Sequence, residues 1–166
     1  MSDFILRPIH DEDKEWIARL ITDRWGSEII VVHQTLYTPT DLPGIVAVRM
    51  DKRVGLITYH IRGHECEIVT LDSLSPSIGI GTSLIREVRK IARDAGCRRL
   101  WLITTNDNVQ ALRFYQKRGF VLVAIHRNAV EGARKIKPEI PMVNEEGIPI
   151  RDEIELEMIL DALDEE

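Results

Sequence analysis

At Gly79 the spacing of apolar residues along this chain changes from a period of two to a period of 3.6. Before Gly79, β-branched segments alternate apolar and polar residues, as strands with one buried face do. After it, an apolar stripe repeats at helical spacing and stops before Gly96, which can end a helix in a left-handed conformation. The stripe contains Leu84, Ile85, Val88, Ile91 and Ala92. The change predicts a mixed α/β fold in which helices flank one sheet.

The first half is predicted to be mainly an antiparallel meander. Residues 4–9 form a first strand and residues 11–21 an amphipathic helix with an acidic first turn. Further strands are expected at 28–33, 45–50, 54–61 and 65–74, with a proline-containing stretch at 38–44 and turns at 51–53 and 62–64.

The second half is predicted to alternate strands with helices, which implies parallel pairing through crossovers. Strands are expected at 100–103 and 120–125, helices at 108–118 and 128–137, and a last strand at 153–160. We expect one domain over residues 1–166, with a core at about 4–125. A C-terminal extension at 127–160 would complete the sheet, and residues 161–166 would form a frayed tail.

Composition argues against several classes of partner. With 22 basic and 27 acidic residues the net charge is -5, both signs are interspersed, and no basic stripe is present to bind nucleic acid. No apolar run approaches the roughly 20 residues that span a bilayer, so we expect a cytoplasmic protein without a membrane partner. Cys66 and Cys97 are isolated, and the histidines show no ligand spacing, so we expect buried thiols and no metal.

The segment Gly79-Ile80-Gly81-Thr82 follows a predicted strand and opens the helix. Two glycines allow close approach of a ligand, and the helix start offers N–H groups that suit a phosphate, although an ordinary strand-to-helix turn has the same pattern. A P-loop would need lysine where Gly81 precedes Thr82. A dinucleotide fold would need glycine at Leu84 and an acidic residue near Thr104 and Thr105. Both alternatives are disfavoured, which leaves a pyrophosphate held by backbone N–H groups.

A second segment carries a more specific pattern. Asn108-Val109-Gln110-Ala111-Leu112-Arg113-Phe114-Tyr115-Gln116-Lys117-Arg118-Gly119-Phe120 resembles the NxxAxxFYxxxGF signature of the Gcn5-related N-acetyltransferase (GNAT) family. Together with the glycine turn and the order of elements, the resemblance covers about residues 4–125. It implies a GNAT-like sheet with a central parallel strand pair, and acetyl-CoA as co-substrate.

The resemblance also implies a cofactor site. The pyrophosphate would be held by residues of the turn, and the pantetheine arm would pair with the end of the preceding strand at Ser73 and Leu74. Pro76, which donates no N–H, stands where the family usually has glutamine or arginine. Asn108 would either cap its helix or hydrogen-bond the cofactor. The predicted turn residues are Ser77, Ile78, Gly79, Ile80, Gly81 and Thr82.

In the family that this chain resembles, the amine attacks the thioester directly in a ternary complex. Only about 1 in 2,500 molecules of a lysine-like amine is neutral at pH 7, so a general base is needed. Glu67 is the first candidate and Asp72 the second, and simple strand alternation places them on opposite faces of the sheet. Tyr115 matches the position from which a phenol reaches the CoA sulfur, or it is simply a core residue of its helix.

The acceptor amine is not identified by the sequence. Trp25 and residues 37–42 fall where the family builds its acceptor pocket, and a small or amino-acid-like amine is favoured over a protein N-terminus or lysine. A non-catalytic sensor of acyl-CoA is an alternative, which would need neither Glu67 nor Tyr115. The last strand can also join two copies as a homodimer, which the sequence does not establish.

Overall fold

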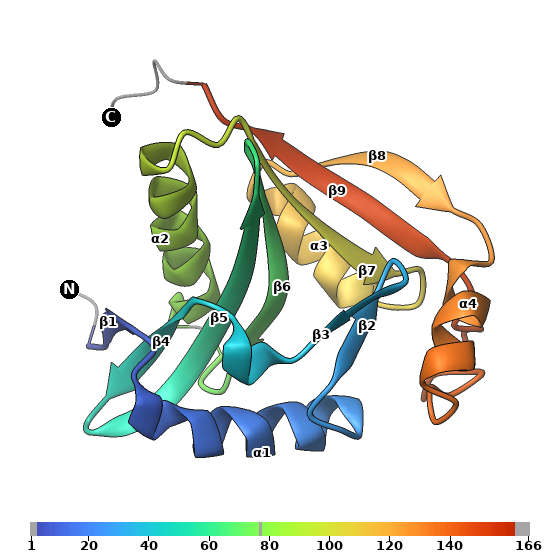
Figure 1. Cartoon of the computed structure of the whole chain (residues 1–166), viewed down its shortest axis with the longest axis horizontal. Coiled ribbons are helices and arrows are strands. Elements are labelled where there is room, and N and C mark those ends of the chain that lie inside the picture. The colour runs from blue at the N-terminus through green and yellow to red at the C-terminus, as the bar shows by residue number, and fades with distance from the viewer. Residues whose placement is uncertain (1–2, 77, 162–166) are drawn as a thin grey trace.

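A computed structural model of the chain, described here for residues 3–76 and 78–161, is built on a seven-stranded sheet with the strand order β1-β4-β5-β6-β7-β9-β8 (Figure 1). All neighbouring strands pair antiparallel except β6 and β7, which are parallel. The main-sheet strands are β1 (Ile5–Pro8), β4 (Gly44–Arg49), β5 (Lys52–Arg62), β6 (Glu65–Ser73), β7 (Arg99–Thr105), β8 (Val121–His126) and β9 (Glu153–Ile159). The predicted mixed α/β fold with its central parallel pair is confirmed.

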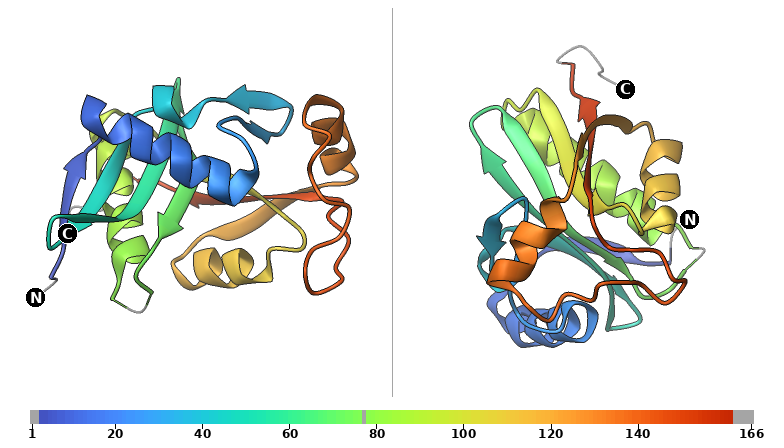
Figure 2. Two further views of the ribbon diagram at one scale, coloured as in Figure 1. Left: turned by 90° about the horizontal axis from the view of Figure 1, so that it is seen from below. Right: turned by 90° about the vertical axis from the view of Figure 1, so that its right-hand side faces the viewer.

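Helices lie on both faces of this sheet. On one face lie α1 (Lys14–Trp25), α4 (Ala129–Ile136) and a small hairpin of β2 (Ile30–Val32) and β3 (Thr35–Tyr37). On the other face lie α2 (Ile80–Asp94) and α3 (Val109–Lys117), as Figure 2 shows. Short 3-10 helices precede α1 at Asp11–Asp13 and β4 at Pro39–Asp41. Of the helices in the described ranges, none is long and apolar enough to cross a membrane.

Two hydrophobic clusters hold these layers together. The larger lies between the sheet and helices α2 and α3, and it includes the predicted stripe residues Leu84, Ile85, Val88 and Ala92. The smaller lies under α1, where Ile17 and Ile21 pack against strands β4 and β5. The apolar residues of α1 and those of α2 thus cover opposite faces of strands β4 and β5. Successive apolar residues along these strands therefore point into two different cores.

Asp13 ties the start of α1 to the sheet. Its side chain has no exposed surface and accepts hydrogen bonds from Arg7 at 2.7 and 2.9 Å, from Arg53 at 2.7 Å and from the His10 backbone at 2.7 Å. These donors hold the pKa of the Asp13 carboxyl well below its ordinary value, with the Arg7 hydrogen bonds as the largest cause and burial opposing them. The side chain therefore stays ionised in the folded protein.

The structure corrects three expectations. Residues 28–33 do not join the main sheet, because β2 pairs only with β3 in a separate hairpin. The turn predicted at 51–53 consists of Met50 and Asp51 with positive φ, and β5 already begins at Lys52. The parallel pairing predicted for the second half does not extend to β7 and β8, because β9 lies between them and pairs antiparallel with both. Of the predicted tail 161–166, residues 162–166 lie outside the described residues.

Candidate active site

The parallel strands β6 and β7 separate soon after they meet. They pair only over Glu65–Glu67 and Arg99–Trp101, although β6 continues to Ser73 and β7 to Thr105. Figure 1 shows the two strands diverging from this short paired region. The edge of β6 that faces β7 is thus left without a strand partner beyond Glu67, and an extended ligand can pair with it as an added strand would.

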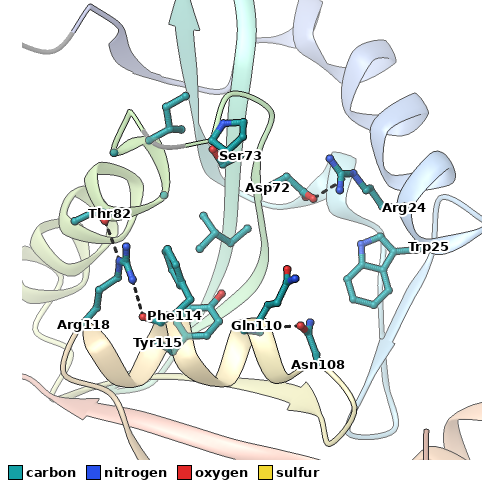
Figure 3. Close-up of a pocket in the computed structure, with 16 residues that line it drawn as sticks. Arg24, Trp25, Asp72, Ser73, Thr82, Asn108, Gln110, Phe114, Tyr115 and Arg118 are labelled. Atoms are coloured by element: carbon teal, nitrogen blue, oxygen red, sulfur yellow. Dashed lines mark hydrogen bonds and ion pairs between the residues drawn. The ribbon is translucent and has the colours of Figure 1, made fainter. Parts of the chain in front are cut away.

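A pocket of about 740 Å³ occupies the region where these strands diverge. It runs from the start of α2, past the side chains of α3, to the C-terminal end of α1 (Figure 3). Its lining residues are Arg24, Trp25, Leu71, Asp72, Ser73, Pro76, Gly79, Ile80, Gly81, Thr82, Asn108, Gln110, Ala111, Phe114, Tyr115 and Arg118. The pocket therefore joins the predicted phosphate turn to two of the predicted catalytic residues, Asp72 and Tyr115.

The end of the pocket that is predicted to hold phosphate is built on the start of α2. Gly79 has φ 84°, a left-handed conformation that favours glycine, and it turns the chain into the helix. A Cβ added at Gly81 would lie 2.9 Å from Phe114 Cζ, so glycine allows α3 to pack closely here. The first N–H groups of a helix have no partner within the helix, and they carry the positive end of its dipole. This end of the pocket suits an anion.

Arg118 adds a positive charge beside the helix start. Its Nε donates to Thr82 Oγ1 at 2.9 Å, one terminal nitrogen donates to the Phe114 carbonyl at 2.8 Å, and the guanidinium lies 3.5 Å from the Phe114 ring centroid (Figure 3). The sequence motifs do not point to this residue. An arginine just before Gly119 is typical of the C-terminal end of a helix. Only the packing of α3 against α2 brings this one to the pocket.

Most of the predicted cofactor residues line the pocket: Ser73, Gly79, Ile80, Gly81, Thr82, Asn108 and Tyr115. Ile78 instead packs against the larger core, and the Leu74 N–H donates to the Val54 carbonyl at 2.8 Å. Ser77 lies outside the described residues. Asn108 is an N-cap, because its side chain accepts from the Ala111 N–H at 3.1 Å, and it also borders the pocket.

Tyr115 lines the pocket, with its ring packed edge-on against Phe114 and Phe120. Burial and the nearby Asp72 carboxylate raise the pKa of the phenol above its ordinary value, against a smaller opposing effect of Arg118. Tyr115 is therefore protonated at neutral pH. It can donate a hydrogen bond into the pocket, but it is a poor general base.

The two candidate carboxylates lie on the same face of the sheet, and the expectation of opposite faces is wrong. Thr58 pairs with Thr70 and Tyr59 with Ile68, so Val69 is an extra residue in β6, a β-bulge that shifts the alternation by one position. Glu67, Thr70 and Asp72 consequently share the face toward α1. The bulge cannot be recognised from the apolar pattern, because residues 68–71 are apolar or threonine throughout.

Glu67 lies at the last paired position of β6, where the strands begin to separate, and not in the lining of the pocket. It is 6% exposed and accepts a hydrogen bond from Tyr37 Oη at 2.9 Å. Burial raises the pKa of this carboxyl to about 7, helped by Glu153 and Glu155, although the Tyr37 hydrogen bond lowers it. A carboxyl with this pKa is half ionised near neutral pH, which suits a general base.

Asp72 borders the pocket and lies 3.8 Å from Arg24 Nε (Figure 3). Burial raises its carboxyl pKa, and the Arg24 charge opposes that change. Arg24 and Trp25 end α1 at the side of the pocket away from the phosphate turn. The sequence predicts Trp25 near the acceptor but does not point to Arg24, whose helical position gives no sign of the distant Asp72.

The two cysteines give no support to a covalent acetyl-enzyme. Cys66 and Cys97 are buried free thiols, and burial raises the pKa of Cys66 to about 12 and that of Cys97 in the same direction. Such thiols are poor nucleophiles at neutral pH. Within the described ranges, no three His, Cys, Asp or Glu side chains are grouped to hold a metal ion.

The diverging parallel strands and the glycine-started helix beside them form a pocket that suits a ligand with an anionic end and an extended arm. The model of the Acetyltransferase (GNAT) family matches residues 9–120. The chain belongs to this family.

The chain is also similar to proteins of known sequence and, in its fold, to solved structures. YdhI of Bacillus subtilis strain 168 is 43% identical over 158 residues, which cover 95% of this chain and 99% of YdhI. YxbD of the same strain is 43% identical over a region that covers 85% of this chain and 89% of YxbD. Among solved structures, the IAA acetyltransferase of Bacillus cereus ATCC 14579 is similar with a TM-score of 0.72 and 24% identity, covering 95% of this chain and 99% of that one. A GNAT acetyltransferase of Elizabethkingia anophelis with acetyl-CoA bound has a TM-score of 0.67 and 20% identity, covering 96% and 100%.

Proposed function

We propose that this protein transfers an acetyl group from acetyl-CoA directly to a primary amine within a ternary complex. The observation that carries the proposal is the separation of β6 from β7, which opens a continuous pocket from the start of α2 to Tyr115 beside the exposed edge of β6. The pyrophosphate fits the helix start, and the extended pantetheine arm fits the strand edge near Leu71 and Ser73. That order brings the thioester to Tyr115.

Glu67 is the proposed general base. An amine with a pKa of about 10.4 must lose a proton before attack, at a cost of roughly 4.6 kcal/mol at pH 7. The Glu67 carboxyl lies where the strands meet, on the face toward α1 and the hairpin, and its raised pKa makes it a better proton acceptor than an ordinary carboxylate. Asp72 is less suitable because the Arg24 charge opposes the rise in its pKa.

A small or amino-acid-like amine is the proposed acceptor. Arg24 and Trp25 border the pocket at the end away from the phosphate turn, so that end presents an aromatic surface and a paired positive and negative charge. The hairpin and α4 lie on the same face of the sheet and take up space over its C-terminal strands (Figure 2). Such surroundings favour a compact acceptor over a folded protein substrate.

The proposal is tested by titration calorimetry with acetyl-CoA, CoA and ATP, followed by thiol release with a panel of amines and peptides. We expect micromolar binding of acetyl-CoA, no comparable binding of ATP, and turnover with at least one small amine. Binding without turnover on any amine or peptide would favour a sensor of acyl-CoA. Absence of acetyl-CoA binding would contradict both functions.

Replacing Arg118 with alanine should weaken acetyl-CoA binding. The guanidinium is held at the start of α2 by Thr82 and Phe114, and a lost hydrogen bond from a charged group costs about 1.5 kcal/mol, or roughly tenfold in Kd. Calorimetry measures the change, and Arg113→Ala, which removes the same charge from an exposed position of α3, is the control. Equal Kd values for the two variants would remove Arg118 from the binding site.

Replacing Tyr115 with phenylalanine should lower kcat about tenfold and leave the Kd of acetyl-CoA nearly unchanged. The ring and its packing against Phe120 remain, while the hydroxyl that stabilises charge on the leaving sulfur is lost. The deficit should be smaller than that of a variant without the base, because a CoA thiol of pKa about 8.5 leaves readily as thiolate. Unchanged acetyl transfer by Tyr115→Phe would leave Tyr115 with a packing role only.

A further inference from the structure

Glu67 is held by a residue from outside the main sheet. The Tyr37 hydroxyl donates to Glu67 Oε1 at 2.9 Å, and its ring lies 5.8 Å from that of His60, which pairs with Glu67 across β5 and β6. Tyr37 is the last residue of β3. The position of the hairpin therefore decides whether this hydrogen bond to the carboxylate forms.

The hairpin β2–β3 is too small to hold itself in place. Each strand has three residues, and the turn between them uses His33 and Gln34 with φ of 48° and 63°, as in a tight two-residue turn. An isolated two-stranded hairpin is marginally stable at best in water. Its position must come from contacts with other parts of the chain.

Ile30 and Val32 of β2 pack in the smaller hydrophobic cluster under α1, and the C-terminal segment adds contacts from three places. The His33 N–H donates to Glu153 of β9 at 2.9 Å, and the Glu153 side chain is buried. The His33 ring lies 4.4 Å from the ring of His126, at the end of β8. Next to α4, the buried Lys137 donates from Nζ to the Ile29 carbonyl at 2.9 Å, just before β2 begins. Residues 126–153 thus fasten both the base and the tip of the hairpin.

The groups around Glu67 act on its charge in opposite directions. Burial and the carboxylates of β9 oppose ionisation, while the Tyr37 hydrogen bond favours it. Arg99 of β7 lies on this face and binds Glu155 and Glu157, so part of the β9 charge is already neutralised. The titratable or charged groups packed around Glu67 are Tyr37 from β3, His60 and Arg62 from β5, Glu65 and Cys66 from β6, Arg99 from β7, and Glu153, Glu155 and Glu157 from β9.

We propose that Tyr37 is a positioning residue for Glu67, and that the C-terminal segment, by fastening the hairpin, sets the orientation and proton affinity of this base. The inference rests on the proposed function, because it requires Glu67 to accept the proton of the amine. It assigns to residues 126–153, all of which lie beyond the family match at 9–120, an indirect part in the chemistry through the hairpin. It also gives a reason for the hydrogen bond that the buried Glu67 carboxylate accepts from Tyr37 of the separate hairpin.

Two substitutions should shift the pH dependence of acetyl transfer in opposite directions. Tyr37→Phe removes a hydrogen bond that favours the ionised carboxylate, so the acid limb of kcat/KM should move about one pH unit higher, with a lower kcat and an unchanged KM for acetyl-CoA. Glu153→Gln keeps an oxygen for the His33 N–H but removes a nearby negative charge, so the limb should move to lower pH. Tyr59→Phe, on the opposite face of β5, is the control and should leave the limb in place.

Glu67→Gln separates the failure of this inference from the failure of the proposed function. If Glu67→Gln is inactive at neutral pH but neither Tyr37→Phe nor Glu153→Gln moves the limb, the positioning role is refuted and the base is retained. A uniform fall in kcat at every pH for Tyr37→Phe would likewise assign Tyr37 a structural role alone. If Glu67→Gln keeps the wild-type rate and pH limb, the proposed base itself is wrong.

Discussion

Glu67→Gln should lower acetyl transfer at pH 7 by about 100-fold or more, since a positioned general base typically contributes about 10²- to 10⁴-fold. The substitution keeps the size of the side chain and an oxygen that can accept from Tyr37. The Kd of acetyl-CoA should remain unchanged, because Glu67 lies outside the lining of the pocket. The deficit should shrink as the pH approaches the pKa of the acceptor, where the amine is neutral without help. Thiol release between pH 6 and 10 measures both effects.

The wild-type protein should show an acid limb in kcat/KM centred near pH 7, since the carboxylate must be ionised to accept a proton and burial raises its pKa to about 7. Glu65→Gln is the matched control, because Glu65 lies two residues earlier on β6 and its side chain is 51% exposed. Asp72→Asn tests the rival base. A large loss for Asp72→Asn together with a small loss for Glu67→Gln would transfer the role to Asp72.

Asp13→Ala should lower the free energy of unfolding by about 3 kcal/mol at pH 7. The substitution leaves Arg7 and Arg53 without their shared buried partner and removes the acceptor for the His10 N–H, and breaking a buried ion pair costs about 3 to 5 kcal/mol. We expect the lower end of that range because both arginines are partly exposed. Urea denaturation measures the change.

The effect of Asp13 should depend on pH with a defined sign. Its pKa is depressed in the folded protein, so its contribution is complete above the ordinary carboxyl pKa of about 4 and is lost as the pH falls toward the folded value. Wild type and Asp13→Ala should therefore differ less at pH 2.5 than at pH 7. Asp11→Ala, at an exposed position of the same turn, should change stability by less than about 0.5 kcal/mol. A similar loss for both variants would mean that the buried network is not the cause.

The elements with long, regular apolar patterns were predictable from the sequence. The stripe through Leu84 and Val88 required a helix against a sheet, and the structure places it in the larger core as expected. Elements of three residues were not predictable in the same way. The segment around Val32 was assigned to the main sheet, because β-branched composition indicates a strand but not which strand will pair with it. The same limit applies to β9, whose insertion between β7 and β8 is a pairing between distant segments.

In the candidate site, too, residues that belong to local motifs were predictable and residues brought in by packing were not. The glycine turn and Tyr115 could be found because their chemistry is encoded within a few consecutive residues, and both border the pocket. Arg118 and Arg24 reach it only through the packing of helices. The relation between Glu67 and Asp72 was mistaken because one extra residue, Val69, inverts every side chain after it, and a bulge in an apolar run leaves no trace in the pattern.

By itself, the sequence determined the α/β fold, the glycine turn at the start of α2 and the resemblance to acetyltransferases, because these depend on periodicity and short spacing along the chain. The tertiary structure alone decided the separation of β6 and β7, the common face of the two carboxylates, and the contact of Tyr37 with Glu67. Each of these depends on register and packing between segments that lie far apart in sequence, such as His33 and Glu153. Local spacing carries no information about such contacts, because their free energy arises only when the folded chain brings the partners together.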